Sequence, residues 1–247
     1  MSKITVDINN IKNNLKKIGY VVSDCLERNN NGLNWQLKFS NSGAIVTIYD
    51  TNNNKNTVVN GKLEPEEGKS LKEIIDRIKC KELLIDPLNE DIIMLINKKQ
   101  EADFYDYKSQ WHESKDKLLH DILCLANNKD NKDAYLIIGV EDTGNVVGIN
   151  EEQKTNDLYD FLKTIKFAGD HIPPIEVKKM YYKYKKIQVL VCKSSKYVPF
   201  YLVEKCRGVC DHRIYTRVGD TNTPTDKHAN YFDVENLWRI HFQREHE

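Results

Sequence analysis

Apolar and polar positions follow two different periods along the first part of the chain. Apolar residues at helical spacing predict amphipathic helices at 11–18 and 69–78. Between them, runs rich in β-branched and aromatic residues predict strands at 35–39, 44–49 and 57–60. We therefore expect a small α+β unit in which helices cover one antiparallel sheet.

The remaining pattern predicts a second unit of mixed α/β structure. Strands are expected at 135–140, 187–192 and 214–218, and helices at 117–126 and 157–165. Pro87 argues against a continuous helix between the two units, because proline lacks a backbone donor and clashes with the preceding turn; a short helix is expected at 90–96. The predicted organisation is an α+β module at 1–82, a linker at 83–99 and a second domain at 100–247.

Composition narrows the classes of function. Lys plus Arg equals Asp plus Glu at 37 each, so any surface for a polyanion must be a local patch. No apolar run approaches the roughly 20 residues that span a bilayer, and residues 1–10 lack the pattern of a secretion signal. We expect a cytoplasmic protein with no membrane partner and with reduced cysteines. The absence of a phosphate-binding Gly-rich loop and of a Gly-x-Ser-x-Gly motif disfavours nucleotide hydrolysis and serine hydrolase chemistry.

Several motifs in the second domain occur in a characteristic order. They are Glu101-Ala-Asp-Phe-Tyr-Asp106-Tyr-Lys108, Leu118 to Ala126, the buried run Ala134 to Asp142, Gly144-Asn-Val-Val-Gly148, and Ile214-Tyr-Thr-Arg-Val-Gly219. In this order they resemble the Schlafen family, including its shorter bacterial members with a Schlafen-like AlbA domain. The resemblance spans most of the second domain and implies a Schlafen-like mixed α/β fold there.

The same resemblance implies a site and an activity. In Schlafen ribonucleases two acids and an aspartate after the following strand hold a divalent cation, and the matching residues here are Glu101, Asp106 and Asp142. Carboxylate oxygens are the ligands that Mg²⁺ and Mn²⁺ prefer, and such a cation assists phosphodiester cleavage. Asp106 stands where the family usually has glutamate. The alternative is that these acids are solvated, with Asp142 in a turn.

Basic residues extend the predicted site. Lys108 lies two residues beyond Asp106, so both should share one face of a strand, where the ammonium would pair with carboxylates or contact the scissile phosphate. The segment 178–186 alternates lysines with tyrosines, which suits phosphate contact and base stacking; the alternative is a hairpin with a solvated face. The candidate nucleic-acid-binding residues are Lys178, Lys179, Lys183, Lys185, Lys186 and Arg217.

A structural zinc site is a further candidate. Cys206, Cys210 and His212 have spacing compatible with Zn²⁺, and His171 or Cys192 would complete a tetrahedral set. Mammalian Schlafen proteins carry zinc in this part of the domain. Buried or unused thiols are the alternative.

The first 80 residues resemble, more loosely, the TATA-box-binding-protein-like module found in type-three ribonuclease H enzymes and some ribonuclease toxins. That likeness implies a sheet that binds nucleic acid or a partner; the alternative is a hairpin that only packs on helices. The leading hypothesis is a metal-dependent endoribonuclease that acts on transfer RNA or other structured RNA as a toxin or antiphage effector. A homodimer is expected to replace the two-lobed clamp of larger Schlafen proteins. The rival hypotheses are a non-catalytic nucleic-acid-binding or transcription-regulatory module and a protein-interaction adaptor.

Overall fold

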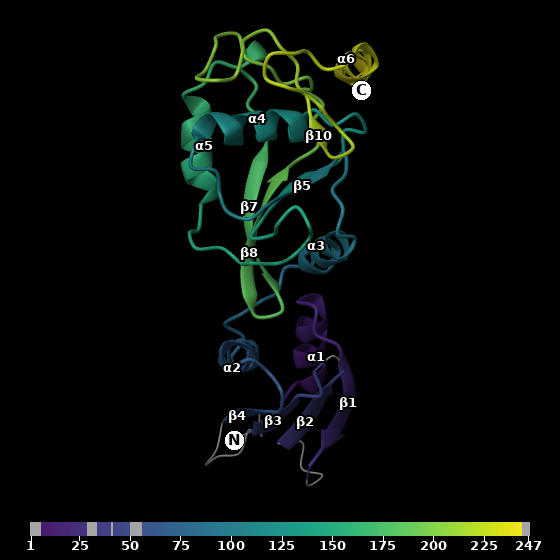
Figure 1. Ribbon diagram of the computed structural model, residues 1–247, viewed down its shortest axis with the longest axis vertical. Coiled ribbons are helices and arrows are strands. Elements are labelled where there is room, and N and C mark those ends of the chain that lie inside the picture. Colours follow the sequence, from purple (N-terminus) through teal and green to yellow (C-terminus); the bar gives the residue numbers. More distant parts are fainter. Residues whose placement is uncertain (1–5, 29–33, 41, 50–55, 244–247) are drawn as a thin grey trace. The chain divides into compact units, whose positions relative to one another are not determined.

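The computed structural model describes residues 6–28, 34–40, 42–49 and 56–243 (Figure 1). The chain forms two compact units. The first unit consists of residues 1–95 together with 180–185, and the second consists of 96–179 and 186–247. Both units combine helices with sheets, so the predicted α+β class is confirmed.

The first unit contains a four-stranded antiparallel sheet that packs with two helices, α1 and α2, and it also includes most of a third helix described below. The strands follow each other in the order β1-β2-β3-β4. Its elements are α1 (Ile8–Lys17), β1 (Val22–Glu27), β2 (Asn34–Phe39), β3 (Ile45–Tyr49), β4 (Thr57–Asn60) and α2 (Pro65–Lys79). The predicted helices and strands are all present. Strand β1 was not predicted because it is an edge strand of mostly polar, exposed residues without clear alternation.

The core of the first unit follows from the apolar stripe on α2. Leu71, Ile74, Ile75 and Ile78 recur at helical spacing and are all buried. They pack in one cluster with inward-facing sheet residues such as Leu37 and Val46, and with the apolar face of α1.

Helix α3 (Leu88–Asn97) begins directly after Pro87 and fills most of the predicted linker. Residues 83–95 belong to the first unit. Within that unit, the buried Asn89 side chain donates hydrogen bonds to the carbonyls of Lys17 (2.7 Å) and Tyr181 (2.8 Å). It also accepts one from the Tyr181 amide (2.9 Å). These bonds hold the tip of a later hairpin, residues 180–185, in the first unit.

The second unit is built on a mixed four-stranded sheet in the order β5-β6-β8-β7. Strand β5 runs parallel to β6, and β6 runs antiparallel to β8. The elements are β5 (Tyr105–Lys108), α4 (Lys115–Ala126), β6 (Ala134–Ile138), α5 (Thr155–Lys163), a 3₁₀ turn η1 (Ala168–Asp170), β7 (Ile175–Tyr182), β8 (Lys185–Cys192), β9 (Arg217–Val218), β10 (Thr221–Asn222) and α6 (Tyr231–Gln243). The strand expected at 214–218 is confined to its last two residues, which pair with β10.

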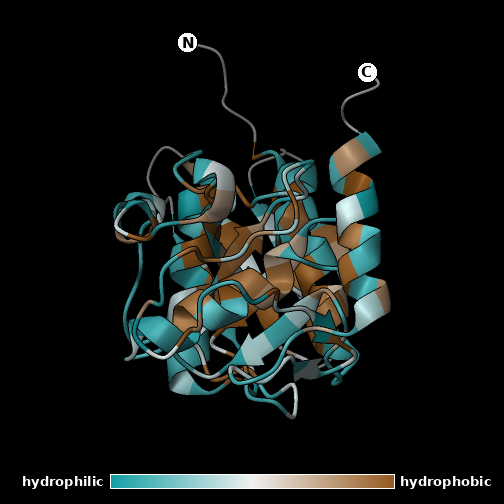
Figure 2. Ribbon diagram, turned by 90° about the horizontal axis from the view of Figure 1, so that it is seen from above, coloured by the Kyte–Doolittle hydropathy of each residue, from teal (hydrophilic) through white to brown (hydrophobic). Residues whose placement is uncertain are grey.

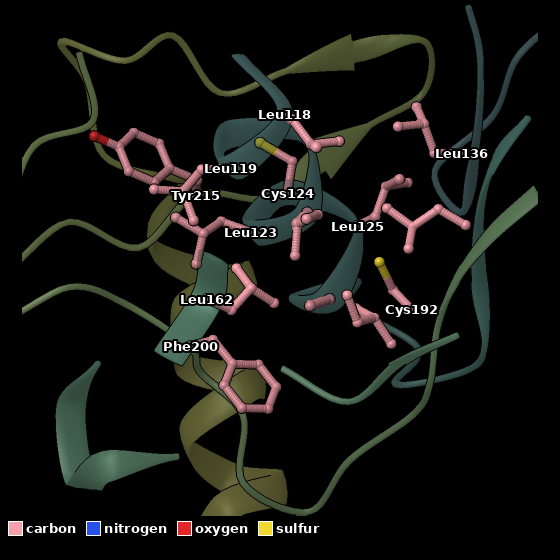
Figure 3. Close-up of a cluster of buried hydrophobic side chains, with 14 of the residues drawn as sticks. Leu118, Leu119, Leu123, Cys124, Leu125, Leu136, Leu162, Cys192, Phe200 and Tyr215 are labelled. Atoms are coloured by element: carbon pink, nitrogen blue, oxygen red, sulfur yellow. The ribbon is translucent and has the colours of Figure 1, made fainter. Parts of the chain in front are cut away.

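Helices α4 and α5 cover one face of this sheet. Figure 3 shows the side chains that meet there, including Leu119 and Leu123 of α4, Leu162 of α5 and Phe200. At the end of α4, the fully buried Asn127 donates to the carbonyls of Phe200 (2.8 Å) and Tyr215 (3.1 Å) and accepts from the Phe200 amide (2.7 Å). One side chain thereby satisfies two loops that would otherwise bury unpaired backbone groups.

The helices of the structure are short or amphipathic. Helix α6, which ends beside the C label in Figure 2, alternates hydrophobic and hydrophilic stretches along its ribbon. Across the described ranges, no helix combines the length and the apolar character that a bilayer span needs.

Candidate functional site

The first two predicted acids, Glu101 and Asp106, form an acidic pair at the edge strand β5. Parallel pairing sets Asp106 beside Leu136 and Lys108 beside Ile138. Laterally paired residues of a sheet point to the same face, and Leu136 and Ile138 face the core beneath α4. Asp106 therefore points into the layer between sheet and helix, where only 2% of its surface is exposed.

A buried arginine joins the two acids. Arg217 Nη2 lies 2.6 Å from Glu101 Oε2 and 3.2 Å from Asp106 Oδ1. The second Asp106 oxygen, Oδ2, lies 2.5 Å from Lys108 Nζ, so the predicted pairing of Lys108 with a carboxylate on its own strand face is present in the structure. Buried charges need such partners, because an unpaired carboxylate in an apolar layer is strongly unfavourable.

The carboxyl group of Glu101 has a shifted pKa. The pKa of the Glu101 carboxyl is raised to about 7, first by burial and then by the neighbouring Asp106 carboxyl. The hydrogen bond from the Tyr107 amide to Glu101 Oε1 (2.9 Å) and the Arg217 charge act in the opposite direction. Two carboxylates held this close repel each other, so a bound cation would relieve the pair.

Asp142 takes a different position from the acidic pair. It is exposed, in the turn after β6 that is closed by hydrogen bonds between Gly144 and Glu141 (2.7 Å) and between Glu141 and Asn145 (2.9 Å). Gly144 has φ +79°, and a side chain there would meet the Lys99 backbone at 2.9 Å, so the turn requires glycine. The turn that the sequence offered as an alternative for Asp142 is thus present.

The predicted convergence of three acids on one cation is not found. Throughout the part of the chain that the structure describes, no group of three or more His, Cys, Asp or Glu side chains is placed to hold a metal ion. The physical reason is that Glu101 and Asp106 turn toward Arg217, whereas Asp142 emerges into solvent from a glycine turn.

Among the described residues, no metal-binding group is formed by the expected zinc ligands Cys206, Cys210 and His212. His212 is exposed and lies 3.1 Å from the Asp211 carboxylate. The two residues considered as fourth ligands are also engaged: the His171 ring packs on Tyr197, and Cys192 is buried in the apolar core. All six cysteines are free thiols.

The basic segment 178–186 is the β7–β8 hairpin, with its turn at 183–184. Several of its lysines have intramolecular partners: Lys178 lies 3.6 Å from Glu176, Lys179 pairs with Glu152, and Lys185 lies over the Tyr184 ring. Lys186 is exposed. Arg217, predicted to contact nucleic acid, is instead buried in the acidic site.

Sequence reasoning missed a polar extension of the site. Arg217 Nη1 donates to Asn222 Oδ1 (2.9 Å), Asn222 Nδ2 donates to Asp121 Oδ1 (2.8 Å), and Asp121 Oδ2 lies 2.6 Å from His112 Nε2. The available signal was Asp121 itself, a carboxylate that follows His120 within a mostly apolar stretch of α4. A charged residue at a buried helix position needs a partner and so marks a polar site.

Comparison with known proteins agrees with this architecture. A family model described as Schlafen, AlbA_2 matches residues 101–226, just over half of the chain, and this range contains the acidic pair, Arg217 and the His112 network. Comparison with curated proteins finds no match. Comparison with solved structures finds none either.

Proposed function

The chain belongs to the Schlafen AlbA_2 family, and from this premise we propose that it is a metal-dependent endoribonuclease acting on structured RNA such as transfer RNA. Membership itself supports a nucleic-acid-related function. The observation that carries the finer proposal is the acidic pair, in which partly buried Glu101 has a raised pKa beside buried Asp106. Carboxyl groups with perturbed pKa values concentrate at functional sites.

The donor chemistry of the acidic pair fits Mg²⁺ or Mn²⁺. Mg²⁺ is usually bound by one or two carboxylates and completes its shell with waters and substrate phosphate oxygens, so two acids suffice. Glu101 and Asp106 would hold the cation, and Asp142, the third ligand expected from the family, would join them only if its exposed turn moved toward the pair. When bound, the cation would supply charge stabilisation for the oxygens that gain charge at the phosphate.

The neighbouring bases have distinct roles in this proposal. Arg217 is buried and bonded to both acids, so it positions their carboxylates. Lys108 is partly exposed beside Asp106, and its ammonium would contact an RNA phosphate once the cation replaces it as the partner of that carboxylate.

The test is cleavage of labelled transfer RNA with Mn²⁺, with and without EDTA. Glu101→Gln keeps the shape of the side chain and an acceptor for the Tyr107 amide but cannot carry a negative charge. We expect EDTA to abolish cleavage and Glu101→Gln to slow it by about 100-fold or more. Asp142→Asn should reduce it as well, whereas the matched control Glu141→Gln, in the same exposed turn, should not.

Two outcomes would count against this function. Equal cleavage by wild type, EDTA-treated protein and Glu101→Gln would exclude the acidic pair as the site. Tight RNA binding without any cleavage would favour the second candidate, a non-catalytic nucleic-acid-binding module. That candidate has its own support, since Arg217 and Lys108 already neutralise the acids.

The proposal extends to assembly and setting. A homodimer would rebuild the clamp that larger Schlafen proteins form from two lobes, and a two-fold interface is the simplest closed arrangement. A cytoplasmic toxin or antiphage effector is the setting we propose for such an enzyme. Light scattering of the purified protein tests the dimer directly.

A further inference from the structure

A histidine and a buried aspartate are connected to the acidic pair by hydrogen bonds and have no role in the proposal above. His112 lies in the loop that leaves β5, four residues after Lys108. We propose that His112 is a further catalytic residue, a general base whose Nδ1 takes a proton from the water that attacks the RNA phosphate. This inference rests on the proposed ribonuclease function and adds a residue to that site.

The hydrogen bonds fix which ring nitrogen is available. Asp121 Oδ2 lies 2.6 Å from His112 Nε2, and Asp121 Oδ1 accepts from Asn222 (2.8 Å). An ionised carboxylate only accepts hydrogen bonds, so Nε2 carries the proton in this pair. The neutral His112 ring therefore has its lone pair on Nδ1.

That nitrogen is open to a reacting group. Among residues with described positions, none bonds to His112 Nδ1, and 17% of the side chain is exposed. Asp121 is only 6% exposed and sits on the rigid helix α4. A buried aspartate that holds one imidazole nitrogen orients the ring and stabilises the imidazolium formed when the other nitrogen accepts a proton.

A continuous network connects this dyad, His112 with Asp121, to the acidic pair. Asp121 is bonded to Asn222, Asn222 to Arg217 (2.9 Å), and Arg217 to Glu101 and Asp106. A base and a cation-binding pair that are joined by one hydrogen-bonded network are held in defined relative positions. This fits a reaction in which a phosphate at the acids is attacked by a water bound at His112.

The proposed step balances as a hydrolysis. A water O–H bond breaks and its proton moves to Nδ1, while the water oxygen forms a bond to phosphorus. The P–O bond to the leaving nucleotide breaks, and the leaving oxygen takes up the proton from the imidazolium. The imidazole is then neutral again, and no oxidant or further reactant is needed.

The structural alternative is that His112 only anchors the β5–α4 loop to α4. Two substitutions separate the roles. His112→Gln retains an amide donor for Asp121 but cannot act as a base, and His112→Ala leaves space for imidazole from solution. His120→Gln is the matched control, because His120 lies on α4 next to Asp121 and bonds a backbone carbonyl, that of Thr223 (2.8 Å), rather than a carboxylate.

Single-turnover cleavage of labelled transfer RNA with Mn²⁺ is the measurement, with RNA affinity and melting temperature recorded for each variant. We expect His112→Gln and His112→Ala to slow cleavage by about 100-fold or more with RNA affinity unchanged. Added imidazole should restore His112→Ala but not His112→Gln, and His120→Gln should cleave at the wild-type rate.

Each contrary result has a distinct meaning. Wild-type rates for His112→Gln, or folded variants of which His112→Ala is not restored by imidazole, overturn the assignment of His112 and leave the ribonuclease proposal intact. A 2′,3′-cyclic phosphate at the product end would show attack by the ribose oxygen and overturn water as the proton source. A wild-type protein that cleaves no RNA overturns both proposals.

Discussion

At the residue scale, the site is defined by how burial changes the chemistry of individual side chains. Asp106 lies in the layer beneath α4, and the fold places both this acid and Glu101 against one guanidinium. The pair was predictable from its resemblance to a known motif. Its arginine partner was not, because Arg217 is 116 residues from Glu101 in the chain and reaches it only through the tertiary fold.

Glu101 should make the metal-free protein less stable as pH rises toward neutrality. Its folded pKa of about 7 exceeds the ordinary value of 4.5, so between these values the folded state keeps a proton that the unfolded chain has lost. Stability therefore falls as pH rises through that window. Urea unfolding in EDTA at pH 5 and 7.5 should show wild type losing stability relative to Glu101→Gln, which does not ionise. A constant difference between the two proteins at both pH values would contradict the raised pKa.

The cysteines offer an independent test of burial. Burial raises the pKa of the Cys192 thiol to about 12, and it also raises the pKa of Cys124. Because the thiolate is the reactive form, neither should react with iodoacetamide at pH 8 in the folded protein, whereas the exposed Cys80 should react readily. Mass spectrometry after brief labelling reads each site separately. Denatured protein, in which all sites should label, is the control.

At the element scale, periodicity predicted most of the structure. The apolar stripe of α2 and the buried run of β6 each have a strong local signal, and both elements are present within a few residues of the expected bounds. Strand β1 lacks such a signal, and the signal at 214–218 predicts a longer strand than the two residues that form one. Their conformation depends on which neighbour they pair with, and pairing is a tertiary property.

The buried side chain of Asn127, at the end of α4, binds the backbone of two loops. Asn127→Ala would leave the Phe200 amide and the carbonyls of Phe200 and Tyr215 buried without their partner. Unsatisfied buried groups cost about 1–3 kcal/mol, so we expect a loss of about 3 kcal/mol in the free energy of unfolding, measured by urea denaturation. Asn150→Ala, on the exposed surface, should change it by less than about 0.5 kcal/mol. Equal effects would mean that Asn127 does not hold the two loops.

At the scale of the whole molecule, charge balance limits how RNA is bound. With 37 basic and 37 acidic residues, the chain has no net attraction for a polyanion, so binding must depend on a local surface. The base of the β7–β8 hairpin, which lies in the second unit, is such a surface. Two of its lysines, Lys179 and Lys186, project from neighbouring strands, although Lys179 already pairs with Glu152.

Salt dependence measures whether these lysines contact phosphates. Each phosphate contact contributes about 0.9 to the slope of log affinity against log salt concentration on a duplex and about 0.7 on a single strand. Replacing Lys179 and Lys186 with glutamine should therefore weaken binding of transfer RNA and reduce that slope by about 1 to 2. The matched control replaces Lys69 and Lys72, exposed on α2 of the first unit, and should leave the slope unchanged. If the control flattens the slope as much as the hairpin variant does, binding depends on diffuse charge, and the hairpin is not the RNA surface.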